Sequence, residues 1–222
     1  MEIIEEAEYH HEVTPKQLDA FLAQGWRHFG PLFFRYSLAF MYGSFEEIIA
    51  LRVDLENFTP TKSQRRILRK NADVETRVGP AFVDARKEKM FVEHAERFTD
   101  NQPDSIYSFI SKVPATSPNR CDSLDVLLGD DLVATSFLDM GDEATSSVYA
   151  MFEPTQAKRG LGIFTILAEI EYARAQGKRW YYIGYATTGP SVYDYKKQLP
   201  ALEVLDWETG TWSPMARVIR PQ

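Results

Sequence analysis

The sequence predicts an α+β fold, in which a mixed sheet is flanked by helices and preceded by a small N-terminal lobe. Three observations support this. Three strand-like segments separated by short turns indicate an antiparallel meander. A long apolar segment that ends at a glycine indicates a helix after the meander. The 222 residues, 44% of them hydrophobic and 13% aromatic, can bury a sizeable core. We place the boundary after residue 59, giving an N-terminal lobe over 1–59 and a main domain over 60–222.

The N-terminal lobe is predicted to contain one helix and one strand. Residues 1–12 form an acidic tail with five glutamates and no lysine or arginine. Thr14 is a candidate N-cap, Pro15 follows it in the first turn, and Gly25 ends the helix. Residues 51–55 alternate between apolar and polar side chains, as expected for a strand with one solvated face.

The main domain is predicted to begin with two helices, the first of them capped by Ser63. Glycine- and aspartate-rich turns then separate the strands of the meander, and Gly177 ends the long helix. The expected elements are, in chain order, helices over 63–71 and 82–98, strands over 124–128, 132–140 and 146–152, a helix over 161–176, a strand over 180–184 and a hairpin over 202–212. This order matches the Gcn5-related N-acyltransferase (GNAT) architecture.

Composition excludes several classes of protein. The net charge of −7 argues against a general nucleic-acid-coating protein, which would be basic. No apolar run approaches the ~18 residues of a membrane span, and the acidic N-terminus has the wrong sign for a signal peptide. The single cysteine, Cys121, cannot form an internal disulfide or a multi-cysteine metal site. We therefore expect a cytoplasmic protein without a metal cluster, a cofactor or a membrane partner.

One basic segment stands out against the acidic background. It places five cations in nine residues and contains no acidic residue that would give i,i+4 pairing. A helix with charges of one sign repels itself unless an anion docks on it, although most charge runs are simply solvated faces. The candidate binding residues here are Ser63, Gln64, Arg65, Arg66, Arg69 and Lys70.

A glycine-containing turn precedes the long helix of the main domain. Glycines at a helix start allow close backbone approach to a ligand, and the free N–H groups and helix dipole favour an anion. The alternative is an ordinary tight turn between a strand and a helix. The candidate binding residues are Lys158, Arg159, Gly160 and Gly162.

Four side chains are candidates for proton transfer or charge stabilisation. Tyr185, Tyr195 and Lys196 would line a cleft with phenols and an ammonium group. Glu153 precedes a proline at the end of a strand, where a carboxylate can receive a proton from an attacking amine. The alternatives are core aromatics, a surface lysine and a surface glutamate at a turn.

Several motifs occur in a fixed order: Phe58–Asn71, Leu132–Asp139, Ser146–Tyr149, Gly160–Glu171, Tyr182–Tyr185 and Tyr195–Lys196. Together they resemble the aminoacyl-tRNA–protein transferases of the N-degron pathway, particularly the bacterial branch. The resemblance extends over about residues 14 to 207. It is more specific than any single motif, because the order and the spacing agree together.

The resemblance implies a GNAT fold that uses charged tRNA in place of acyl-CoA. The α-amine of an acceptor protein or peptide beginning with Asp or Glu would attack the ester of arginyl- or leucyl-tRNA. The ester is already activated, so positioning of the amine can supply much of the rate. The basic segment would then face tRNA phosphates.

The sequence departs from the family in two places. The family carries cysteines for a metal or iron–sulfur cluster after its Phe-Phe-Arg element, whereas residues 36–43 contain none. Glu153 stands where the family tends to carry aspartate. Two other interpretations remain open: an acyl-CoA-dependent N-acyltransferase, and a catalytically inactive regulatory homologue.

Overall fold

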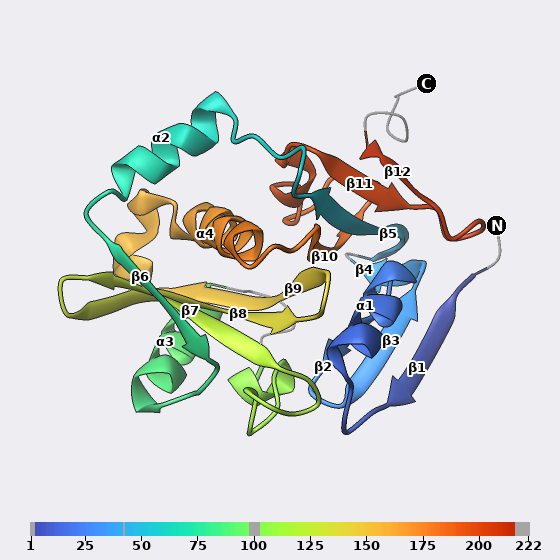
Figure 1. Cartoon of the computed structure of the whole chain (residues 1–222), viewed down its shortest axis with the longest axis horizontal. Coiled ribbons are helices and arrows are strands. Elements are labelled where there is room, and N and C mark those ends of the chain that lie inside the picture. Colours follow the sequence, from blue (N-terminus) through green and yellow to red (C-terminus); the bar gives the residue numbers. More distant parts are fainter. Residues whose placement is uncertain (1–2, 42, 98–102, 216–222) are drawn as a thin grey trace.

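The computed structural model describes residues 3–41, 43–97 and 103–215 (Figure 1). Its strands form two sheets, a small one with the order β1-β3-β2 and a nine-stranded one with the order β12-β11-β5-β10-β9-β8-β7-β6, in which β4 also pairs with β5. The strands of the small sheet are β1 (Glu5–Tyr9), β2 (Arg27–Phe29) and β3 (Leu32–Tyr36). Those of the large sheet are β4 (Leu38–Met41), β5 (Ser44–Asp54), β6 (Glu75–Pro80), β7 (Cys121–Leu128), β8 (Asp131–Met140), β9 (Ala144–Phe152), β10 (Trp180–Thr187), β11 (Leu202–Leu205) and β12 (Trp212–Pro214).

The helical elements lie between these strands. The α-helices are α1 (Pro15–Ala23), α2 (Lys62–Lys70), α3 (Ala85–Ala95) and α4 (Leu161–Ala175). Short 3₁₀ turns are η1 (Ile106–Ser108), η2 (Pro154–Arg159) and η3 (Lys196–Gln198). No helix among the described residues combines the length and the apolar character that crossing a membrane requires.

The predicted α+β fold is confirmed, and it is GNAT-like. Strands β6 to β9 form an antiparallel meander, after which α4 crosses over to β10, which pairs in parallel with β9. Figure 1 shows α3 below the meander and α4 above it. These helices bury different clusters, because Met90 and Phe91 of α3 pack with Phe137, whereas Phe164 of α4 packs with Val133. The two helices therefore cover opposite faces of the meander.

Two details of the prediction are wrong, and five strands were missed. Helix α2 begins one residue earlier than predicted, and its N-cap is Thr61 rather than Ser63. The missed strands are β1, β2, β3, β4 and β6. Every residue of β1 is exposed, so it lacks the apolar alternation that identifies a half-buried strand.

The division after residue 59 stays a prediction. Strand β5 precedes that boundary, yet it is hydrogen-bonded between β10 and β11 in the large sheet. The small sheet and α1 form the remainder of the N-terminal lobe and share a core, in which Leu18, Leu22 and Phe33 pack with Tyr182 of β10. The lobe thus contributes a central strand to the sheet that carries the candidate site.

The sheet opens between β9 and β10. Their pairing covers only residues 144–146 opposite 180–182, and the register of β10 against β5 shifts between Tyr182 and Gly184. Gly184 has a φ of +90°, which favours glycine. Because β9 and β10 diverge beyond these positions, groups from the N-terminal lobe and from the segment after β10 reach the gap.

Candidate active site and basic surface

Helix α2 is fastened to the turn that begins α4. The Lys70 ammonium donates to the carbonyl of Lys158, and the Asn71 amide donates to the carbonyl of Arg159 at 3.1 Å. Arg159 also forms a paired contact with Asp73 at 2.8 and 2.9 Å. The structure thus brings the two predicted binding segments together, although they are about 90 residues apart in the sequence.

Gly160 lies at the centre of this junction. It adopts a left-handed conformation with φ +73° and is the N-cap of α4. A Cβ added there would be 3.7 Å from Ile67 of α2, so the turn and the helix are in close packing. Gly162, in the first turn of α4, packs against Phe152 in the same way, at 3.6 Å. These are ordinary contact distances, so it is the positive φ of Gly160, at the start of α4, that favours glycine here.

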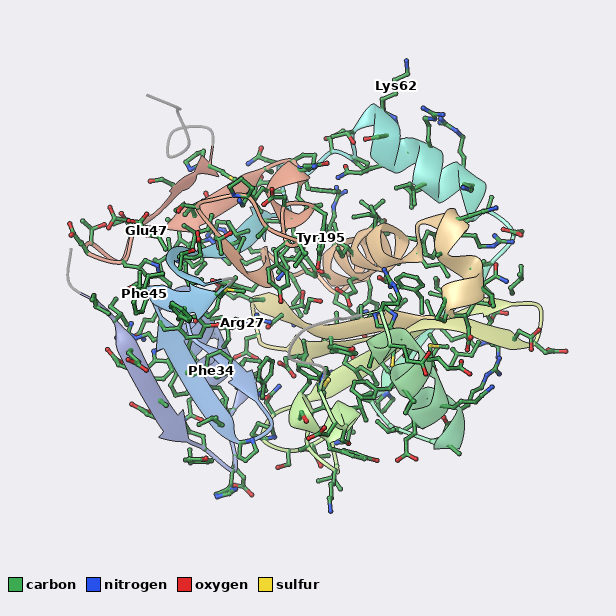
Figure 2. The ribbon with its side chains drawn as sticks, turned by 180° about the vertical axis from the view of Figure 1, so that it is seen from behind. Arg27, Phe34, Phe45, Glu47, Lys62 and Tyr195 are labelled. Carbon is green, nitrogen blue, oxygen red and sulfur yellow. The ribbon has the colours of Figure 1, made fainter. Side chains whose placement is uncertain are left out.

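The junction presents a basic surface, which consists of Lys62, Arg65, Arg66, Arg69, Lys70 and Lys158. All six side chains are exposed, and Figure 2 shows Lys62 pointing outward from α2. Within the described residues, no ion pair joins any of them to a carboxylate. Arg159 differs, since Asp73 already neutralises it. The surface is thus free to take a polyanion.

Two residues predicted to bind have structural contacts instead. Gln64 is 6% exposed, and its side chain accepts a hydrogen bond from the Thr61 backbone at 2.8 Å. The Thr61 hydroxyl in turn accepts from the Gln64 backbone at 3.2 Å, which completes a capping box. Ser63 is exposed and its hydroxyl lies 2.9 Å from that of Thr61. Gln64 therefore holds the start of the helix, and contact of either residue with a ligand stays a prediction.

Lys196 lies at the open part of the sheet. Its ammonium donates to the carbonyl of Tyr185 at 2.9 Å and lies 4.9 Å from the centre of the Tyr193 ring. Burial, together with the positive charge of Arg27, lowers the pKa of Lys196 to about 7. A lysine with such a pKa can exist in both protonation states near neutral pH, as a proton acceptor requires.

Arg27, on β2, is a site residue that sequence reasoning missed. Its guanidinium donates to the Ser146 hydroxyl at 2.5 Å and to the carbonyl of Ser147, which ties the lobe to β9 where the sheet opens. Figure 2 shows Arg27 where the N-terminal lobe meets the sheet, below Tyr195. Its only sequence signal is a single arginine within an aromatic-rich stretch.

Glu169, on α4, is a second residue without a predicted role. It is fully buried, and it accepts a hydrogen bond from the Tyr181 hydroxyl. Burial raises the pKa of Glu169 to about 7, while the hydrogen bond from Tyr181 partly offsets that rise. Its signal in the sequence was an acid flanked by the apolar side chains of a buried helix. A buried carboxylate with this pKa carries a proton for part of the time at neutral pH.

The two tyrosines of the predicted site differ in accessibility. The Tyr185 hydroxyl donates to the carbonyl of Gly25 at 2.6 Å, so it links β10 to the lobe, and burial raises its pKa. Tyr195 is 40% exposed, and burial of its phenol, with Tyr193 and Glu169 nearby, raises its pKa to about 12. Tyr195 therefore stays protonated at neutral pH and can donate a hydrogen bond.

Glu153 lies apart from this group. Burial and the carboxylate of Glu93 raise its pKa, while Lys89 and Arg86 lower it, and all three neighbours belong to α3. Helix α3 covers the opposite face of the meander from α4. Lys196, in contrast, precedes Leu199, which packs against α4. The catalytic role of Glu153 stays a prediction that these contacts do not favour.

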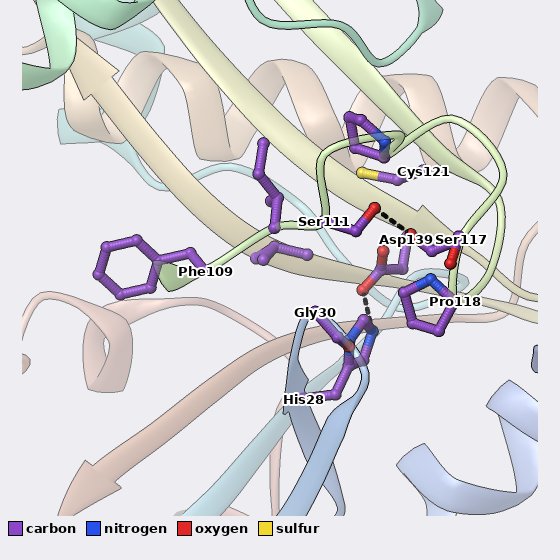
Figure 3. Close-up of a pocket in the computed structure, with 11 residues that line it drawn as sticks. His28, Gly30, Phe109, Ser111, Ser117, Pro118, Cys121 and Asp139 are labelled. Carbon is purple, nitrogen blue, oxygen red and sulfur yellow. Dashed lines mark hydrogen bonds and ion pairs between the residues drawn. The ribbon is translucent and has the colours of Figure 1, made fainter. Parts of the chain in front are cut away.

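A small cavity separates the lobe from the meander (Figure 3). His28 lies at its edge, 2.8 Å from the carboxylate of Asp139 and 2.9 Å from the carbonyl of Gly30. His28 thus connects the lobe to β8 of the meander. The buried thiol of Cys121 also lines this cavity, and burial raises its pKa, which disfavours a nucleophilic role. In the part of the chain that is described, no group of three or more His, Cys, Asp or Glu side chains could hold a metal ion.

The architecture is that of a GNAT-like transferase, and comparisons with known proteins specify the family. A sequence model described as "Arginine-tRNA-protein transferase, C terminus" matches residues 81–206. This chain therefore belongs to the arginine-tRNA–protein transferase family, and it is an aminoacyl-tRNA–protein transferase.

Curated relatives agree with this assignment. The aspartate/glutamate leucyltransferase of Stenotrophomonas maltophilia (strain K279a) is 31% identical over 199 residues, which cover 83% of this chain and 75% of that protein. The protein of the same name from Cereibacter sphaeroides (strain ATCC 17029 / ATH 2.4.9) is 27% identical over 93% of this chain and 74% of its own length. Among solved structures, FemX is similar, with a TM-score of 0.54 and 10% identity over 84% of this chain and 65% of that chain. The latter similarity supports the fold alone.

Proposed function

We propose that this protein transfers leucine from leucyl-tRNA to the α-amine of a protein or peptide that begins with Asp or Glu. Leucine and the acidic acceptor are chosen because the curated relatives are named aspartate/glutamate leucyltransferases. Arginine is the second candidate for the transferred residue, because the family model is named for it. An N-degron role and a cytoplasmic location, where charged tRNA is available, belong to this proposal.

The observation that carries the proposal is the basic surface fastened to the start of α4. Six exposed cations without carboxylate partners among the described residues suit a phosphate backbone, whose binding is dominated by such contacts. A single small anion would need fewer of them. The tRNA acceptor end would enter the open part of the sheet from this surface, and the Gly160 turn would lie beside it.

The chemistry follows from the groups at the opening of the sheet. The acceptor α-amine loses its proton and attacks the ester carbonyl, the C–N bond forms, and the bond to the ribose oxygen then breaks. We assign to Lys196 the removal of the amine proton and its return to the leaving ribose oxygen. Tyr195, which stays protonated, can donate a hydrogen bond to the oxyanion. Tyr185 acts through its carbonyl, which positions Lys196.

The test is a transfer assay with leucyl-tRNA or arginyl-tRNA and peptides that begin with Asp, read by mass spectrometry. We expect a mass gain of one leucine on the free N-terminus and none on the same peptide with an acetylated N-terminus. Absence of transfer of either amino acid would exclude the proposal. Acetyl-CoA serves as the counter-ligand, because it should stabilise an acyl-CoA enzyme against heat but not this one. Turnover with tRNA also excludes a purely regulatory homologue.

A further inference from the structure

We infer that Arg27 is the residue that recognises the acidic side chain of the acceptor, by binding its carboxylate beside Lys196. This inference rests on the proposed function and assigns the acceptor specificity to one guanidinium. The occupant is the side-chain carboxylate of an N-terminal Asp or Glu.

The guanidinium of Arg27 is held rigidly but is not saturated. Two of its N–H groups donate to Ser146 and Ser147 on β9. Its backbone is also fixed, because the preceding Gly25 is packed so closely against Leu205 and Trp207 that an added Cβ would be 2.6 Å from both. A guanidinium carries five N–H donors in a planar fork. The remaining donors are thus held in a defined orientation.

The carboxylates in the neighbourhood of Arg27 are engaged elsewhere. Asp139 is 2.8 Å from His28, and Glu169 accepts from the Tyr181 hydroxyl. Both carboxylates act on Arg27 only at longer range. Within the described residues, no carboxylate forms an ion pair with Arg27. A partly buried cation without a close counter-charge is costly, and a carboxylate ligand would compensate it.

Lys196 adds a second positive charge at the same place. A Cβ at Gly184 would lie 3.6 Å from Arg27 Nε and 3.5 Å from Lys196 Nζ, so both cations approach one point. Burial lowers the pKa of Arg27, and the charge of Arg27 helps to lower that of Lys196. An anion bound here would relieve the repulsion between them.

The geometry favours an acceptor carboxylate over a tRNA phosphate. The exposed basic surface of α2 already suits phosphates, whereas Arg27 is enclosed between the lobe and β9. The α-amine and the side-chain carboxylate of an N-terminal Asp are only a few bonds apart. A carboxylate on Arg27 would therefore bring the amine close to Lys196, which we assign as its proton acceptor.

The experiment compares Asp and Asn peptides, which have nearly the same shape and differ in charge. We expect the wild-type protein to favour the Asp peptide about 100-fold in kcat/KM, because an unpaired buried guanidinium rejects the neutral analogue. In Arg27→Met this ratio should fall to below about 5-fold. Arg27→Lys, which keeps the charge and loses the fork, should give an intermediate ratio.

Arg52→Met is the matched control, since Arg52 is a half-buried arginine of the neighbouring β5 with its own partner, Glu203, at 2.7 Å. It should change stability and leave the Asp/Asn ratio intact. A ratio retained in Arg27→Met, or lost equally in Arg52→Met, would overturn the inference.

Calorimetric binding of the two peptides without tRNA separates this inference from the proposed function. If no transfer occurs with any peptide but the wild type binds the Asp peptide at least 10-fold more tightly, and Arg27→Met or Arg27→Lys reduces that difference, the proposed function fails and the carboxylate site stands. Equal binding of both peptides by the wild-type protein would refute the site. If Arg27→Met does not fold, Arg27→Lys takes its place in both measurements.

Discussion

The ammonium of Lys196 donates a 2.9 Å hydrogen bond to the backbone carbonyl of Tyr185, in the part of the sheet where β9 and β10 have separated. This hydrogen bond holds Lys196, whose pKa is lowered to about 7, at the place where the two strands separate. It depends on Gly184, which precedes Tyr185 and has a φ of +90°. The positive charge of Arg27 of β2 acts on this lysine, and the Tyr193 ring lies beside its ammonium.

Lys196→Met should lower kcat for transfer about 100-fold, a typical loss for a proton-transferring group. In the wild type, Lys196 must be deprotonated to accept a proton, so kcat/KM, which reports the free enzyme, should rise with pH through about 7 and then level off. The measurement is a pH profile of kcat/KM for leucyl transfer, taken at low acceptor concentration. Lys197→Met is the control, because Lys197 already pairs with Asp194 at 2.8 Å. A profile with the same inflection in Lys196→Met would refute the assignment.

Arg65→Ala combined with Arg66→Ala should weaken tRNA binding and flatten its salt dependence. Each lost phosphate contact reduces the slope of log K against log salt by about 0.7 to 0.9. Filter binding at several salt concentrations measures the slope. Arg77→Ala, which removes an exposed arginine paired with Glu75 on β6, should leave it unchanged. An unaltered slope in the double variant would show that tRNA docks elsewhere.

Glu169→Gln should change how stability depends on pH. The pKa of Glu169 is about 7 in the folded protein and 4.5 when exposed, so between these values the folded state binds more protons. Wild-type stability should therefore fall as pH rises from 4.5 to 7, by on the order of 3 kcal/mol from this group. The Gln variant should lack that component in urea unfolding at pH 5 and pH 8. Glu171→Gln, at an exposed position of the same helix, should retain it.

Gln64→Ala should lower the stability of the protein by about 1 kcal/mol, because it breaks the capping box of α2. Ser63→Ala should cost less, since Ser63 is exposed and accepts no backbone hydrogen bond of the box. Thermal unfolding measures both. Equal losses in the two variants would mean that the cap is not held by Gln64.

Glu153→Gln should leave leucyl transfer within about twofold of the wild type, well short of the loss expected for a proton-transferring residue. The reason is that Glu153 interacts with α3, on the opposite face of the meander from α4. The same transfer assay checks it. A large loss of kcat would restore the catalytic role that the sequence predicted for this residue.

The sequence predicted the elements whose signals are local. The capping box at Thr14 and Gln17, the turns at 129–131 and 141–143 and the glycine at 177 each act within a few residues. Elements without such signals were missed, such as the fully exposed β1. Candidate site residues were found where charge or glycine made a cluster along the chain, as in α2 and the Gly160 turn.

The sequence by itself determined the α+β class, the order of the main elements and the basic helix, because these follow from periodicity, caps and charge within short segments. Only the tertiary structure decided that Arg27 interacts electrostatically with both Lys196 and Glu169, because these residues come from β2, η3 and α4. It also separated Glu153 from them, since α3 and α4 cover opposite faces of the sheet. Pairing between distant strands and burial of single charges depend on the whole fold, so no local pattern encodes them.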